Sequence, residues 1–118
     1  MASKKNKILQ GDVWLFDPDP TKGHEQGYGP RPCVIMSHDD FNNGAGEMSI
    51  IVPCTTTSRK IPCHIKIPPP EGGVQRISFA MSEQIRSISH VRLKKKLGSV
   101  SEPTLKSIQD WISDLLDL

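Results

Sequence analysis

Short apolar segments separated by proline- and glycine-rich turns constrain the fold of this chain more than any other feature. Ten prolines and nine glycines in 118 residues interrupt the sequence too often for a bundle of long helices. Between the interruptions, the apolar runs have the length and the β-branched and aromatic content of strands. Strands are expected at residues 8–16, 31–37, 48–55 and 62–67, with one or two more in 77–88 and a short one at 97–100. The pattern predicts a small twisted antiparallel sheet or partial barrel.

Two local features modify this pattern. Pro53 fits poorly inside the apolar run Met48–Thr55, so we expect the strand to end or to bulge there. The segment SHDDFNNGAG has the composition of turns, and we expect one helical turn in it, around Phe41.

The last segment changes from a strand-like to a helical apolar period. Apolar side chains recur on one helical stripe at Leu105, Ile108, Ile112 and Leu115, and the stripe is widened by Trp111 and Leu116. Ser101 is a suitable N-cap, and Glu102 and Pro103 suit the first turn. The sequence therefore predicts a mainly β fold closed by one C-terminal helix.

Length and composition suit a single domain. The polar, basic residues 1–7 are expected to form a disordered tail, and residues 8–118 one domain, because no linker or repeat divides them. Only 36% of the residues are hydrophobic, so a homodimer that buries further apolar surface is a reasonable expectation. No segment has the length of a membrane span and MASKKNK leads into no signal peptide, which favours a soluble, cytoplasmic protein.

Charge and cysteine content exclude several functions. The net charge of +2 is too small for general coating of nucleic acid, so any polyanion site must come from local clustering. Three cysteines without a repeating spacing argue against a disulfide framework. Zinc is not expected either, because there is no CxxC or HxxxH motif, and strand alternation would send Cys63 and His64 to opposite faces. The chain also lacks a P-loop and a dinucleotide fingerprint, so no cofactor is predicted.

Four segments in order are GDVWLFDPDPTKGHEQG, RPCVIMS, IVPCTTT and SEQIRSI. Together they resemble the MazF/PemK family of toxin endoribonucleases, also called the Kid family, over residues 8–116. The resemblance implies an SH3-like barrel with added helices that dimerises. It also implies sequence-specific, metal-independent cleavage of single-stranded RNA, usually messenger RNA, which leaves 2′,3′-cyclic phosphate and 5′-hydroxyl ends and inhibits translation and growth. A cognate antitoxin of the MazE/PemI type would block the toxin with a disordered acidic tail.

The resemblance places the catalytic arginine of the family at Arg31 and its catalytic threonine at Thr55. This pair suits the chemistry, because a ribose 2′-hydroxyl supplies the nucleophile and the protein has to stabilise the phosphorane. A planar guanidinium can bind two phosphate oxygens, and a hydroxyl can donate a further hydrogen bond. Without the resemblance, the favoured interpretation of Arg31 is a strand-edge cation paired with Asp12 or Asp17.

The gating loop of the family falls on His24, Glu25 and Gln26. His24 or Glu25 has suitable chemistry for proton transfer near neutral pH, whereas arginine titrates too high for an ordinary base. Gln26, Gly27 and Tyr28 are candidates for substrate binding, the last by stacking on a base. The segment Gly27–Pro30, between the EQ and RP motifs, is longer than in close relatives. The loop geometry and base preference of the family are therefore not carried over to this chain.

The SEQ motif places Glu83 where the Kid branch has an aspartate used as base, and Gln84 where members contact the substrate. Met81 replaces an arginine thought to act as acid in that branch, so Arg31 and Thr55 remain the firmer pair. Glu83 could instead form a structural ion pair with Arg86. Two rival functions stay open, namely a CcdB-like poison of DNA gyrase and a non-catalytic SH3-like interaction module.

Overall fold

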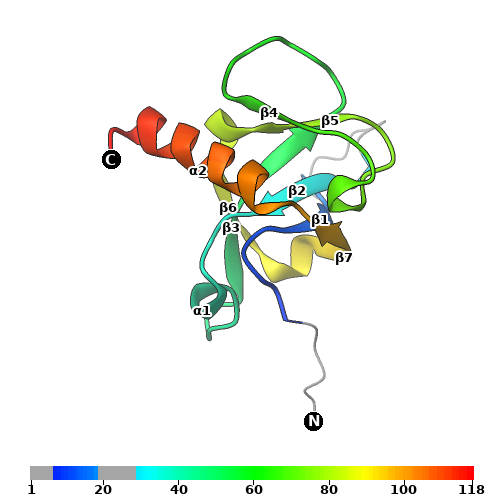
Figure 1. The fold of residues 1–118 in the computed structure, drawn as a ribbon. Coiled ribbons are helices and arrows are strands. Elements are labelled where there is room, and N and C mark those ends of the chain that lie inside the picture. Colours follow the sequence, from blue (N-terminus) through cyan, green and yellow to red (C-terminus); the bar gives the residue numbers. More distant parts are fainter. Residues whose placement is uncertain (1–6, 19–28) are drawn as a thin grey trace.

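Seven antiparallel strands form one open sheet in the computed structural model, which describes residues 7–18 and 29–118 (Figure 1). The strands are β1 (Asp12–Phe16), β2 (Arg31–Ile35), β3 (Met48–Thr55), β4 (His64–Ile67), β5 (Ser78–Met81), β6 (Arg86–Ser89) and β7 (Leu93–Ser99). Their order is β4-β5-β3-β2-β1-β7, and β6 also pairs with β3. The predicted twisted antiparallel sheet with a C-terminal helix is confirmed. The expected tail lies, except for Lys7, outside the described residues.

The first strand begins later than expected because a turn precedes it. Gly11 has a φ of 90°, a conformation that favours glycine, and the N–H of Asp12 donates to the carbonyl of Leu9 at 3.0 Å. The chain therefore enters β1 at Asp12 rather than at Ile8. The second strand is two residues shorter than predicted and ends at Ile35.

Strand β3 spans the predicted residues, but the expectation that it ends or bulges at Pro53 is wrong. It pairs with β6 over Met48–Ile51 and with β5 at Cys54 and Thr55. Pro53 lies between these two partners and has a register partner, Cys33, on β2 alone. A residue without an N–H is tolerated here because one edge of β3 lacks a neighbouring strand at this point.

The region after β4 contains more regular structure than the sequence pattern indicates. Residues 77–88 form two strands separated by a 3₁₀ turn, η2 (Ser82–Gln84). Strand β7 extends over seven residues, although only 97–100 were predicted. Lys94–Lys96 did not indicate a strand, because lysines are uncommon in strands. In the structure these lysines lie exposed on an edge strand that pairs with β1.

The predicted helices are both present. Helix α1 (Asp39–Asn42) contains Phe41, and α2 (Glu102–Leu116) begins after the expected N-cap Ser101. Ile108 of α2 is fully buried against the sheet, whereas Leu115 and Leu116 are 47% and 55% exposed. The stripe as far as Ile112 thus packs against the core, and Leu115 and Leu116 beyond it are exposed. None of the described helices is long and apolar enough to cross a membrane.

Strand alternation divides the core between the two faces of the sheet. Val13, Val34 and Val52 pack with α2 on one face. The opposite face gathers Trp14, Phe16, Cys33, Ile35, Ile51 and Ile88, so the two aromatic side chains belong to the core. The three cysteines are buried and unbridged, and burial raises the pKa of the Cys54 thiol to about 12.

A carboxylate ties the turn η1 (Glu71–Gly73) to the start of α2. Glu71 Oε2 accepts hydrogen bonds from the backbone N–H and the hydroxyl of Ser101, at 2.9 and 3.1 Å. Partial burial acts to raise the pKa of Glu71, but hydrogen bonds from Thr104 and Ser101 outweigh it and hold the pKa below its ordinary value of 4.5. The ionised carboxylate therefore stabilises the folded state.

Replacing Glu71 by glutamine is expected to lower the free energy of unfolding at neutral pH and to flatten its pH dependence under acidic conditions. A carboxyl group whose pKa is depressed by folding contributes stability above its unfolded pKa and loses it as the pH falls through the folded value. Urea denaturation above and below pH 4.5 measures the effect. Glu102→Gln removes the same charge from the first turn of α2 and is the control; equal pH profiles for both variants would contradict the assignment.

Candidate active site

An open cavity of about 530 Å³ lies where β2 begins and β3 ends. Residues 29–32 at the start of β2 and residues 54–57 at the end of β3 line it, together with Arg76 and Ser78 at the start of β5. Its wall includes the cations of Arg31 and Arg76 and the hydroxyl groups of Thr55, Thr56, Thr57 and Ser78. The two residues that the sequence singled out as a catalytic pair therefore share one cavity.

The register of the sheet brings Arg31 and Thr55 together. Cys33 faces Pro53 across β2 and β3, so Arg31 and Thr55 each lie two residues beyond this pair, toward the same end of the sheet. On its other side Arg31 faces Phe16 of β1, and Thr55 faces Phe79 of β5. Because both residues are held by neighbouring strands, the pair stands on rigid backbone.

The guanidinium of Arg31 is not committed to a described carboxylate. Asp12, one of the two partners considered from the sequence, is buried and forms an ion pair with Lys96 Nζ at 3.3 Å. Its Oδ2 also accepts from Trp14 Nε1 at 3.4 Å. No ion pair joins Arg31 to Asp12 or Asp17 within the described part of the chain. The Arg31 side chain can therefore face a ligand in the cavity.

The hydroxyl of Thr55 is oriented by the turn that follows it. Thr55 Oγ1 accepts a hydrogen bond from the backbone N–H of Thr57 at 3.1 Å. This contact uses a lone pair and leaves the hydroxyl proton to donate, which is the role that a negatively charged oxygen in the cavity requires.

Arg76 is a functional candidate that sequence reasoning missed. It is exposed on the cavity wall, in the segment between η1 and β5. Ser78 Oγ donates to the Arg76 carbonyl at 3.0 Å and so fixes the backbone of this segment. No motif in GGVQRISF marks this arginine, because only tertiary contacts bring it beside Arg31. Two cations on one cavity wall attract a polyanion locally, despite the small net charge.

The predicted loop residues His24, Glu25, Gln26, Gly27 and Tyr28 lie outside the described residues. The chain is described again from Gly29, and Gly29 and Pro30 line the cavity. The loop sequence therefore leads directly into this site. Its catalytic and binding roles stay predictions.

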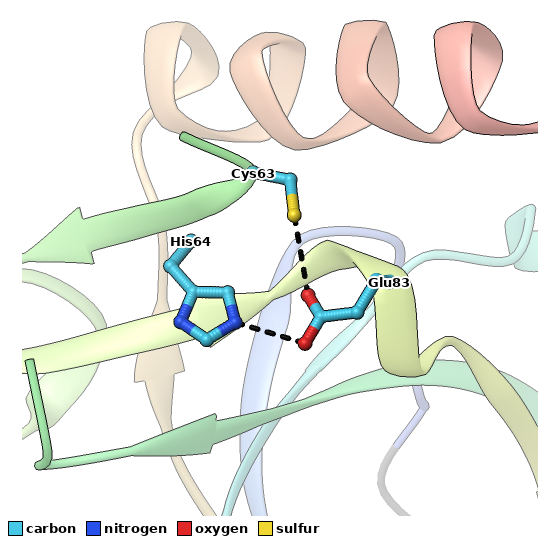
Figure 2. A group of neighbouring side chains, drawn as sticks. All are labelled: Cys63, His64 and Glu83. Carbon is cyan, nitrogen blue, oxygen red and sulfur yellow. Dashed lines mark hydrogen bonds and ion pairs between the residues drawn. The ribbon is translucent and has the colours of Figure 1, made fainter. Parts of the chain in front are cut away.

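Glu83 and Gln84, the remaining predicted substrate contacts, do not line the cavity of Arg31. Glu83 lies instead with Cys63 and His64 at the start of β4 (Figure 2). Its Oε1 accepts from Cys63 Sγ at 3.3 Å, and its Oε2 contacts His64 Nε2 at 2.9 Å. Gln84 Nε2 is 3.4 Å from the same Oε2. The contact of Glu83 and Gln84 with substrate remains a prediction.

The structure decides one open alternative about these residues and corrects one expectation. The partner of Glu83 is His64 rather than Arg86. Cys63 and His64 do not point apart, because Cys63 lies in the turn before β4 and strand alternation does not apply to it. Partial burial acts to raise the pKa of Glu83, yet the hydrogen bonds from His64, from its own backbone and from Cys63 lower it overall. Burial and the neighbouring Glu83 raise the pKa of the Cys63 thiol.

Residues 9–116 match the family described as PemK-like, MazF-like toxin of type II toxin–antitoxin system. The chain belongs to this family. The endoribonuclease toxin MazF of Escherichia coli K12 is 37% identical over 107 residues, which cover 90% of this chain and 91% of that protein. The expectation of a MazF/PemK-type endoribonuclease toxin is thereby confirmed.

Solved structures agree on the fold. The MazE–MazF complex from Deinococcus radiodurans (Form-II) gives a TM-score of 0.82 at 22% identity, covering 97% of this chain and 99% of that chain. A mycobacterial endoribonuclease in complex with its cognate antitoxin gives a TM-score of 0.72 at 22% identity, covering 97% of both chains. The open sheet with its terminal helix is thus the MazF fold.

Proposed function

We propose that the cavity of Arg31 and Thr55 is the active site of a metal-independent endoribonuclease that cuts single-stranded RNA. The observation that carries this proposal is that Arg31, which has no carboxylate partner among the described residues, lines one open cavity with the donor hydroxyl of Thr55, both at the ends of paired strands. The rigid backbone supplies the preorganisation that stabilisation of a transition state requires.

The reaction uses the nucleophile of the substrate. The 2′-oxygen of the ribose loses its proton and attacks the adjacent phosphorus, which forms a pentacoordinate phosphorane. Arg31 binds two of its non-bridging oxygens through its planar fork, and the Thr55 hydroxyl donates to one of them. The bond from phosphorus to the 5′-oxygen then breaks, and that oxygen takes up a proton. His24 or Glu25 moves these protons, and the products carry a 2′,3′-cyclic phosphate and a 5′-hydroxyl.

Selection of the RNA sequence requires contacts beyond the scissile phosphate. Arg76, on the same wall, holds a neighbouring phosphate of the single strand. Phosphate contacts position the chain but carry no sequence information, so bases are read by other groups. Gln26, Tyr28 and Gln84 are the candidates, with Tyr28 offering a stacking surface.

The same positive cavity suits the cognate antitoxin. A disordered acidic tail of the MazE/PemI type would compete with RNA for Arg31 and Arg76, since both ligands are polyanions. We place the homodimeric toxin in the cytoplasm, where cleavage of messenger RNA inhibits translation and growth until the antitoxin binds.

A defined RNA incubated with the purified protein in EDTA tests the proposed chemistry. We expect cleavage at unchanged rate with the chelator, and ends that carry a cyclic phosphate. A 2′-deoxy substitution at the cleaved nucleotide should abolish cleavage there, because it removes the nucleophile. A substrate with a 2′-deoxy substitution two nucleotides away is the control and should be cut normally.

Cleavage of the 2′-deoxy site, or loss of all cleavage in EDTA, would rule out this mechanism. A gyrase poison on the same fold would leave every RNA intact and inhibit supercoiling instead. A non-catalytic interaction module would do neither.

A further inference from the structure

A thiol, an imidazole and a carboxylate converge outside the active-site cavity. The ligand atoms of Cys63, His64 and Glu83 all lie within 4.8 Å of one another. Figure 2 shows the Cys63 sulfur and the His64 ring directed at the two oxygens of one carboxylate. We propose that these three residues form a binding site for a single zinc ion, with water in the fourth position.

The spacing of the three groups suits tetrahedral zinc. Bond lengths of about 2.3 Å to sulfur and about 2.0–2.1 Å to nitrogen and oxygen set neighbouring ligand atoms about 3.3–3.6 Å apart. The observed contacts are 3.3 Å from Sγ to Oε1 and 2.9 Å from Nε2 to Oε2. The ligand atoms lie within 4.8 Å of one another, so they would have to shift by up to about 1 Å to surround one ion.

Burial supports a bound ion. Cys63 is buried, and the side chains of His64 and Glu83 are 3% and 34% exposed. The more exposed carboxylate leaves a path for an ion to enter.

The donor set selects the class of metal. One sulfur, one nitrogen and one oxygen ligand suit zinc, whereas magnesium and calcium require oxygen ligands. Binding displaces the proton that Cys63 now donates to Glu83 and releases it to solvent. The thiolate and the carboxylate then balance the two charges of the ion.

The proposed site would connect two segments that the sheet holds side by side. His64 starts β4 and faces Met81 of β5, and Glu83 belongs to η2, which follows β5. Thr55, in contrast, pairs with Phe79 of β5 and belongs to the active-site cavity. The zinc site thus lies beyond one end of β5 and shares no residue with the Arg31 cavity. It is compatible with cleavage that needs no metal, and it does not depend on the proposed chemistry.

Cobalt(II) is a visible probe for this site. Tag-free protein, stripped of metal and kept reduced, is titrated with cobalt. We expect one ion per chain, a thiolate-to-cobalt charge-transfer band in the near ultraviolet, and d–d bands of tetrahedral intensity. Zinc should then displace the cobalt and raise the melting temperature of the protein.

Variants identify the ligands. Cys63→Ser should abolish the charge-transfer band and the zinc-dependent rise in melting temperature, and His64→Asn or Glu83→Gln should weaken cobalt binding. His38→Asn is the control, because His38 is an exposed histidine beside a carboxylate, Asp40, with no thiol in its cluster. Absence of a thiolate band in the wild type would overturn the proposal, and so would a band that survives in Cys63→Ser. Neither result would affect the test of RNA cleavage.

Discussion

Replacing Arg31 by alanine is expected to lower the rate of RNA cleavage by about 10²–10³-fold, the usual loss when one preorganised donor to a developing oxyanion is removed. The guanidinium lines the cavity without a described carboxylate partner, so the substitution removes a ligand-binding group rather than a structural ion pair. The measurement is the initial rate on a defined RNA, with far-ultraviolet circular dichroism to verify the fold.

Lysine at position 31 separates charge from geometry. Arg31→Lys keeps the positive charge but loses the bidentate fork, so most of the loss in rate should remain. Arg86→Ala is the matched control, because Arg86 is an exposed strand arginine that does not line the cavity, and it should cleave at nearly the wild-type rate. Wild-type cleavage by Arg31→Ala would remove this arginine from the mechanism.

Replacing Gly73 by alanine is expected to destabilise the protein by about 3 kcal/mol or more. A Cβ at Gly73 would lie 2.1 Å from the carbonyl oxygen of Leu97, which is part of β7 and cannot move as a side chain can. The φ of 74° adds the cost of a left-handed conformation, about 1–2 kcal/mol, to the cost of overpacking, about 1–3 kcal/mol. The measurement is the free energy of unfolding from urea denaturation.

Gly46 supplies the control for this substitution. A Cβ at Gly46 would meet nothing within 4 Å, and its φ is not positive, so Gly46→Ala should change stability by less than about 0.5 kcal/mol. Equal stability of the two variants would show that η1 does not press against β7 as described. Gly98 of β7 takes part in the same contact, because its own Cβ would lie 2.9 Å from the carbonyl carbon of Gly72.

Features that depend on local pattern could be predicted from the sequence. The helical period gave α2 with its Ser101 cap, and the apolar run gave β3 with its bounds. Arg31 and Thr55 were placed at strand ends by the turns beside them. Their motifs, read in order, pointed to the family that the comparisons confirm.

Local pattern misled where neighbours decided the outcome. The lysines of β7 have the composition of a solvated surface segment, but backbone pairing with β1 makes this segment a strand. Pro53 indicates a strand break in the sequence, but in the structure it lies between the segments of β3 that pair with β6 and with β5. No N–H is needed there for pairing on that edge. Leu115 fits the apolar stripe of α2, yet it is 47% exposed, because the core packs against the earlier part of that stripe.

The sequence by itself determined most of the strands and the C-terminal helix, because side-chain period and turn chemistry are local along the chain. The order of its motifs indicated the family, and the resemblance to that family singled out the two residues that carry the proposed chemistry. Tertiary structure alone decided that Arg76 joins Arg31 and that Cys63 and His64 meet Glu83 twenty residues further along. Such groupings depend on sheet register and turn geometry, because these bring distant residues within contact distance without leaving a periodic signal in the sequence.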